Sequence, residues 1–189
     1  MSRCAAVPRV FWQEWKLDSS LIDPDFDYES LVWSPWPGRS SGVHCFTEDW
    51  RFESVWRRPE SSLRHALGAE CVIGPDFSVY RSMLALQAVV WQIYRSHQVT
   101  AYWQANGVRV VPCITWRSVD QIVATSWLYP VGIRVIAVRS PGADYVDGWM
   151  AGAGMVRDLM NPDLVLHFGT RSGIEVWDRA INLRLRGGR

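Results

Sequence analysis

The fold of this chain is decided by residues 71–116, CVIGPDFSVYRSMLALQAVVWQIYRSHQVTAYWQANGVRVVPCITW. The stretch begins with a short apolar segment, continues through an amphipathic segment over 82–105, and ends in the β-branched run 108–114. This pattern predicts strand, helix, strand, with Ser82 as the helix cap, Trp91 and Arg95 on its apolar face, and Gly107 just beyond its end. Parallel strands need a crossover of about a dozen residues or more, usually a helix. We therefore expect a parallel strand pair.

The same alternation continues along the chain. Strands are expected at 43–46, 71–74, 108–114, 133–138 and 164–168, and residues 173–177 are expected to extend the sheet. Helices are expected at 59–68, 82–105, 118–127 and 147–160. Alternating strands and helices predict an α/β fold with a mainly parallel sheet of about five strands and crossover helices. A closed barrel needs about eight strands, so an open or partial-barrel sheet is expected.

The chain of 189 residues is expected to divide into three parts. Residues 1–42 are rich in proline and tryptophan and predict an irregular N-terminal arm, which packs on the body because its tryptophans would otherwise be exposed. Residues 43–178 form the α/β domain, with the 47–53 segment as a loop. Residues 179–189 are basic and glycine-rich at the end and predict a flexible tail.

Composition excludes several classes of function. Apolar residues make up 48% of the chain, charged residues 21%, and the net charge is +1, so the overall field does not favour nucleic acid or a membrane surface. The sequence lacks both an apolar run of about 18 residues and a signal-peptide core, and a cytoplasmic location is expected. The spacing of Cys4, Cys45, Cys71 and Cys113 supports no zinc site. No metal or cofactor is therefore expected.

Three carboxylates fall near the predicted strand ends. Asp49 and Glu53 follow the first strand of the domain, and Asp76 follows the second. If these strands are neighbours, the carboxylates converge and could act as an acid/base pair or hold Mg²⁺. The alternative is structural: Asp76 bonds turn N–H groups, while Asp49 and Glu53 pair with nearby arginines. We treat all three as tentative catalytic candidates and leave that alternative open.

A second set of polar and aromatic residues follows the strands or ends the long helix. Such residues suit stacking on nucleic-acid bases or contact with a protein partner. The candidate binding residues are Arg51, Ser78, Tyr80, Arg81, Trp103, Gln104, Thr115, Trp116 and Arg139. The alternative for Trp103 and Trp116 is internal packing at the end of the sheet.

Four blocks of sequence occur in a recognisable order: EDWRFE at 48–53, PDFSVY at 75–80, YWQ at 102–104 followed by Gly107, and VPCITW at 111–116. They resemble an uncharacterised family, catalogued as a domain of unknown function, that occurs in phages, prophages, plasmids and bacterial mobile regions. The resemblance covers about 43–170. It implies a mobile-element setting and brings no activity, cofactor or catalytic residue.

Two hypotheses for function follow. In the first, the protein comes from a phage or mobile element and binds a host protein or nucleic acid through the carboxyl-terminal face of the strands, where ligands sit in α/β folds. In the second, the same face carries a carboxylate-based hydrolase or nuclease, with Mg²⁺ as its possible cofactor. Neutral net charge weakens nucleic acid as the partner in the first, and missing catalytic motifs weaken the second.

Overall fold

The computed structural model describes residues 7–79, 85–141, 146–169 and 174–183. Within these residues the chain forms two four-stranded sheets, in the orders β1-β2-β3-β4 and β5-β6-β7-β8. Every strand pair is parallel. The strands are β1 (Trp33–Pro35), β2 (Gly42–His44), β3 (Cys71–Ile73), β4 (Val110–Val111), β5 (Cys113–Ile114), β6 (Val135–Arg139), β7 (Leu164–Phe168) and β8 (Ala180–Leu183). The expected parallel α/β fold is confirmed.

The two sheets are joined through a single segment of chain. β4 pairs with β3, β5 pairs with β6, and only Pro112 separates the two short strands. Proline has no backbone N–H to donate, while the carbonyl of Pro112 accepts from Ala137 N–H at 2.9 Å. The run 108–114, expected as one strand, thus passes from one sheet to the other at this proline.

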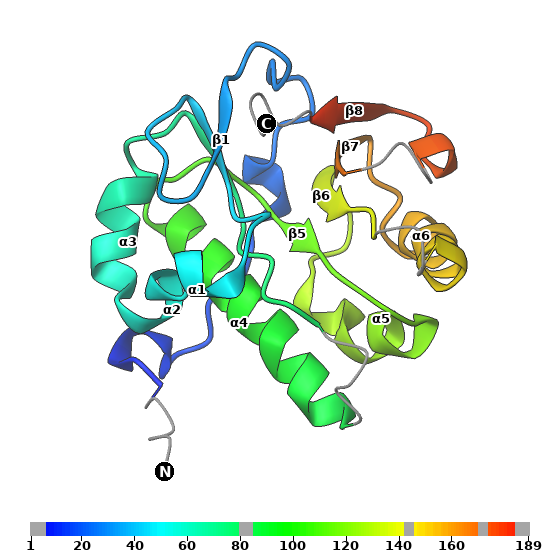
Figure 1. Ribbon diagram of the computed structural model, residues 1–189, viewed down its shortest axis with the longest axis horizontal. Coiled ribbons are helices and arrows are strands. Elements are labelled where there is room, and N and C mark those ends of the chain that lie inside the picture. Colours follow the sequence, from blue (N-terminus) through cyan, green and yellow to red (C-terminus); the bar gives the residue numbers. More distant parts are fainter. Residues whose placement is uncertain (1–6, 80–84, 142–145, 170–173, 184–189) are drawn as a thin grey trace.

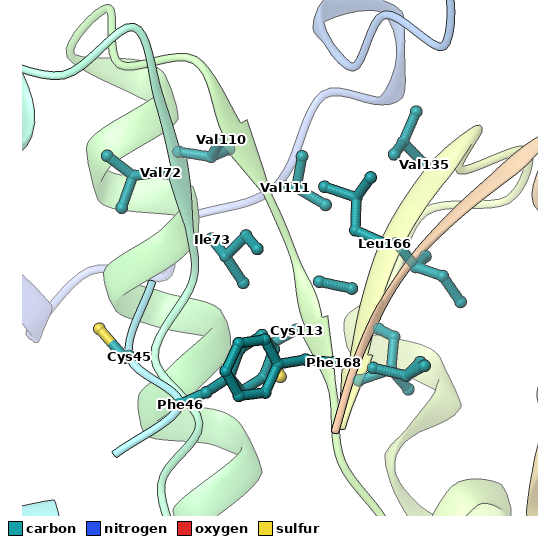
Figure 2. Close-up of a cluster of buried hydrophobic side chains, with 14 of the residues drawn as sticks. Cys45, Phe46, Val72, Ile73, Val110, Val111, Cys113, Val135, Leu166 and Phe168 are labelled. Carbon is teal, nitrogen blue, oxygen red and sulfur yellow. The ribbon is translucent and has the colours of Figure 1, made fainter. Parts of the chain in front are cut away.

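The two sheets curl towards each other and enclose an apolar core. Figure 2 shows Ile73, Val111 and Leu166 between the sheets, with the ring of Phe46 next to Phe168. The Phe46 and Phe168 rings stack with centroids 4.6 Å apart, although the first follows β2 and the second ends β7. The sheets therefore form a partial barrel that is open between β1 and β8, which do not pair within the described chain.

Helices cover the outside of this partial barrel. In Figure 1, α3, α4, α5 and α6 follow one another around the strands in chain order. The α-helices are α1 (Asp49–Phe52), α2 (Ser54–Arg57), α3 (Pro59–Ala66), α4 (Leu86–Ala105), α5 (Val119–Thr125) and α6 (Val146–Met160), and the 3₁₀ turns are η1 (Arg9–Phe11), η2 (Ser19–Leu21), η3 (Ser126–Leu128) and η5 (Ile174–Val176). None of the described helices combines the length and apolar composition needed to cross a bilayer.

Three local expectations are corrected. The 47–53 segment, expected as a loop, contains helix α1. Residues 174–176, expected in a strand, form the 3₁₀ turn η5, and the strand follows at β8. The strands also outnumber the expected total of about five, because β1 comes from the N-terminal arm, β8 from the segment expected as a tail, and the run 108–114 forms both β4 and β5.

Helix α4 is buried differently from the expected stripe. Trp91 is 43% exposed, whereas the helix is buried on all sides from Arg95 to Gln104. The cause is the N-terminal arm, which lies across this half of α4. The Gln98 side chain forms hydrogen bonds with the backbone N–H and carbonyl of Trp15 at 2.9 and 3.1 Å. A polar residue is therefore needed on this face of α4, because an apolar side chain could not satisfy the backbone groups of the arm. Ser82, the expected helix cap, lies outside the described residues.

Candidate functional site

A pocket of about 860 Å³ opens at the carboxyl ends of the strands. Asp49 begins α1 after β2, Asp76 follows β3, Thr115 follows β5, and Arg139 ends β6. The parallel topology brings these four side chains to one place because parallel strands all end at the same edge. The pocket is lined by Phe46, Thr47, Glu48, Asp49, Trp50, Asp76, Ser78, Val79, Ile114, Thr115, Trp116, Arg117, Arg139, Ser140, Pro141 and Trp149.

Asp49 holds the segment that follows β3. Its carboxylate accepts from Ser78 N–H at 3.2 and 3.1 Å and from the Ser78 hydroxyl at 2.7 Å. Bonds to an ionised acceptor are stronger than neutral ones. Both Asp49 oxygens therefore have protein donors, and this carboxylate fixes the backbone on one side of the pocket.

Asp76 is the most deeply buried acid of the pocket, at 9% exposure. One of its oxygens accepts from the Thr115 hydroxyl, and the other lies 3.9 Å from the nearest guanidinium nitrogen of Arg139. Burial raises the pKa of the Asp76 carboxyl above its ordinary value, and nearby Asp49 adds to this rise, while Thr115, Arg139 and Arg117 oppose it. The pocket thus contains a carboxyl group that is disfavoured in its charged form.

Two tryptophans form one wall of the pocket. Trp116 and Trp149 stack with centroids 5.2 Å apart, and the Trp116 Nε1–H donates to the carbonyl of Trp149 at 3.0 Å. A Cβ at Gly152 of α6 would lie 2.2 Å from the Trp116 ring. Gly152 therefore allows α6 to approach Trp116 closely enough for this wall to form.

The base of the pocket is largely apolar and buried. The rings of Phe46, Phe168 and His44 contact one another, and His44 is 1% exposed. The His44 Nδ1 accepts from Phe46 N–H at 3.2 Å. Burial, with a smaller contribution from Arg139, lowers the pKa of His44 to about 4. This imidazole is therefore neutral at physiological pH and belongs to the core.

A buried arginine supports the pocket from behind. Arg95 is 8% exposed, lies 3.2 Å from a Glu53 oxygen, and places its guanidinium 3.8 Å from the centre of the Phe77 ring. Its Nε donates to Gln92 Oε1 at 3.0 Å, and the Gln92 amide donates to the Ser78 carbonyl at 3.2 Å. Ser78 is thus held by Asp49 from one side and by α4 from the other.

Half of the residues expected at the site either lie away from the pocket or fall outside the described residues. Glu53 pairs with Arg95 and with Arg57, each at 3.2 Å, as the structural alternative for Glu53 describes. Arg51 pairs with Glu48 at 3.1 Å. Tyr80 and Arg81 lie outside the described residues.

The expectation that Trp103 and Gln104 face the site is wrong. Trp103 is 0% exposed and stacks on Trp36, with its indole N–H on the Ser62 hydroxyl at 3.3 Å. Gln104 bonds the backbone N–H and carbonyl of Asp18 at 2.7 and 3.0 Å. Both residues lie at the carboxyl end of α4, and a helix between parallel strands ends near the start of the next strand. Trp103 and Gln104 therefore lie near the amino ends of the strands, at the edge opposite the strand-end pocket.

Several residues that line the pocket are not among the predicted site residues, and Glu48, Trp50 and Trp149 are three of them. Trp50, with 73% exposure, and Glu48 are adjacent to Asp49 in a block already quoted, so chain proximity could have found them. Trp149 has no such signal, because its place depends on which face of α6 packs inward. The Arg51 guanidinium lies 4.8 Å from the Trp50 ring centre, within cation–π range.

The donor set for a metal is sparse in what the structure describes. No group of three or more His, Cys, Asp or Glu side chains is placed to hold a metal ion in this part of the chain. Asp49 bonds Ser78, and Asp76 bonds Thr115.

The fold and the pocket define a class: a parallel α/β protein with a partial barrel and a polar pocket at its strand ends. The chain belongs to the family described as Domain of unknown function (DUF4417), whose profile matches residues 37–182. The resemblance seen in the sequence is thereby confirmed.

Two relatives come from mycobacteriophages. The chain is 36% identical to the Gene 1 protein of Mycobacterium phage D29 over 131 residues, which is 67% of this chain and 48% of the relative. It is 32% identical to the Gene 1 protein of Mycobacterium phage L5 over 131 residues, 67% of this chain and 56% of that protein. The chain thus spans about half the length of the curated relatives it matches. No solved structure matches it.

Proposed function

We propose that this protein binds a segment of a host protein in the strand-end pocket. The observation that carries the proposal is that an exposed tryptophan and an exposed arginine line the same concave pocket. Trp50 is 73% exposed, the Arg139 side chain is 49% exposed, and both line the same pocket. Tryptophan and arginine are enriched among the residues that dominate protein–protein binding energy.

The charges of the pocket favour a protein partner over nucleic acid. Glu48, Asp49 and Asp76 line it beside Arg117 and Arg139. A phosphate backbone entering the pocket would meet the carboxylates of Glu48 and Asp49, and like charges repel. A polypeptide segment can offer hydrogen-bond donors or a basic side chain to the acids and a carbonyl or carboxylate to the arginines.

The test compares pocket variants with a matched tryptophan variant. The immobilised protein is incubated with nuclease-treated host lysate, the captured protein is identified and purified, and its affinity is measured by calorimetry. Trp50→Ala and Arg139→Ala are each expected to weaken binding by about tenfold or more, as loss of a contact worth about 1.4 kcal/mol does. Trp127→Ala is the control, because Trp127 is also exposed, at 61%, and does not line the pocket.

Equal affinity of all three variants would place the binding surface elsewhere and contradict the proposal. Loss of capture after nuclease treatment would identify nucleic acid as the partner instead. The proposal is supported only when the two pocket variants lose affinity for the purified partner and the Trp127 variant retains it.

Hydrolysis is the second candidate, and Asp76 favours it. A buried carboxyl with a raised pKa is the kind of group that serves as a general acid. Here single-stranded DNA with millimolar Mg²⁺ is the probe, and cleavage that disappears in Asp76→Asn supports this candidate. Absence of cleavage by the wild-type protein, together with no thermal shift on adding Mg²⁺, contradicts it.

Asp76→Asn is also expected to raise the melting temperature at neutral pH. The pKa of Asp76 is raised in the folded state, so its contribution to stability is full below its unfolded pKa and is lost as pH rises through the folded pKa. Asparagine keeps an acceptor for Thr115 without a buried charge. A gain of a few degrees near about pH 7 that vanishes near about pH 4 is expected, measured by thermal unfolding. An equal loss at both pH values would show that the carboxylate is needed for structure.

A further inference from the structure

A groove separate from the strand-end pocket runs along helix α3. It consists of two cavities, of about 310 and 170 Å³, that share His65 and share no lining residue with the strand-end pocket. The loop between β1 and β2 forms its other side: the Trp36 and His65 rings lie 4.5 Å apart, and His65 Nε2 lies 2.9 Å from the Gly38 carbonyl. We call this the α3 groove, with Arg39, Ser54, Arg58, Ser61, Arg64 and His65 among its lining residues.

The α3 groove is basic. Arg39 and Arg64 line one cavity and Arg58 the other, and none of the described residues lining either cavity is acidic. All three arginines are exposed, and no ion pair involves any of them within the described residues. Nearby Arg57, in contrast, pairs with Glu53 at 3.2 Å. Three arginines thus line a concave surface, and within the described residues none of them is paired with a carboxylate.

These arginines are not needed to complete the end of α3. A cation in the last turn of a helix often compensates its free carbonyls. Here Leu67 N–H donates to the carbonyl of Leu63 at 2.9 Å, and Gly68 N–H donates to that of His65 at 3.1 Å. The next carbonyl, of Ala66, accepts from Ala69 N–H at 3.1 Å. The backbone closes the helix by itself, and the guanidinium groups remain available to a ligand.

We propose that the α3 groove binds phosphate groups. Arginine matches phosphate oxygens with two parallel N–H bonds, and serine hydroxyls such as those of Ser54 and Ser61 add donors. Arg58, Ser61 and His65 lie on one helix face because they are three and four residues apart. Helix α3, Pro59–Ala66, extends about 12 Å at 1.5 Å per residue, which is long enough for more than one phosphate. This site is independent of the host-protein site proposed above.

The experiment uses two phosphate sources on the full chain. Millimolar inorganic pyrophosphate is tested by thermal shift, and a labelled oligo-thymidylate by fluorescence anisotropy at several salt concentrations. Single-strand binding through three arginines is expected to give a slope of log affinity against log salt of about −2, and each of Arg39→Gln, Arg58→Gln and Arg64→Gln should reduce that slope by about 0.7. Arg179→Gln is the matched control, because Arg179 is also exposed and lines neither cavity.

Each outcome is informative. A pyrophosphate shift lost in the groove variants, with no oligonucleotide binding, supports a site for a small phosphorylated ligand. Oligonucleotide binding weakened by the groove variants and not by Arg179→Gln supports a nucleic-acid backbone as the source. No response to either probe, or an equal loss in Arg179→Gln, overturns the proposal. Circular dichroism of each variant confirms that its fold is unchanged, which is expected for exposed side chains.

Discussion

Replacing Arg95 with alanine is expected to lower the free energy of unfolding by about 3 kcal/mol, because the variant loses a buried guanidinium together with its ion pair to the partly buried Glu53. The guanidinium is 8% exposed and contacts Glu53, Gln92 and the face of Phe77. Its loss leaves a void over Phe77 and an unsatisfied Gln92 oxygen. For a chain of this length we expect the melting temperature to fall by about 10 °C.

Arg57→Ala is the matched control for this prediction. Arg57 pairs with the same Glu53 at the same 3.2 Å, but its side chain is 61% exposed. Exposed ion pairs contribute about 0–1 kcal/mol, so this variant should unfold within about 3 °C of the wild type. A similar drop in both variants would show that the charge of Glu53, rather than burial of Arg95, controls the stability of this region.

Arg95→Ala should also disturb the strand-end pocket. Gln92 is positioned by Arg95 and bonds the Ser78 carbonyl, while Asp49 bonds the other side of Ser78. We expect partner affinity to fall even at temperatures where the variant is folded. Unchanged affinity in the folded variant would mean that Asp49 alone holds this segment.

Gly152→Ala is expected to destabilise the protein by about 2–3 kcal/mol. The new Cβ would lie 2.2 Å from the Trp116 ring and 3.1 Å from Ile122. Overpacking of a core costs about 1–3 kcal/mol, and a shifted Trp116 also loses its hydrogen bond to the Trp149 carbonyl. Denaturant unfolding measures the loss, and near-ultraviolet circular dichroism reports whether the Trp116–Trp149 stack is displaced.

Gly154→Ala provides a control of opposite sign two residues along the same helix. Its added Cβ would have no neighbour within 4 Å, and alanine is favoured over glycine inside a helix by about 1 kcal/mol. Gly154→Ala should therefore raise stability while Gly152→Ala lowers it. Destabilisation by both variants would indicate that α6 needs glycine for its backbone rather than for its contact with Trp116.

Local sequence patterns predict much of the fold. The strands at 71–73, 135–139 and 164–168 and the helix that begins at Pro59 lie where the sequence predicts them, because apolar runs and helix-start residues act within a few positions. Parallel topology then carries Asp49, Asp76, Thr115 and Arg139 to one pocket. Strand ends are fixed by the chain direction, so residues that follow strands could be grouped without coordinates.

Contacts between distant segments could not be read from the sequence. Asp49 meets Ser78 across 29 residues, Gln98 meets Trp15 across 83, and Gln104 meets Asp18 across 86. Gly152 and Gly154 look alike in the sequence, and only the first lies against another side chain. Each of these contacts depends on which faces of two structural elements pack against each other.

The sequence by itself determined the parallel α/β class and the edge of the strands at which the pocket opens, because hydrophobic period and strand direction are local properties. Only the tertiary structure decided that Trp103 and Gln104 are internal, that Arg95 is buried beneath the pocket, and that the sheet divides at Pro112. Those features arise when the arm, the helices and the two sheets exclude water from the same surfaces. Burial of that kind is a property of the assembled chain rather than of any segment.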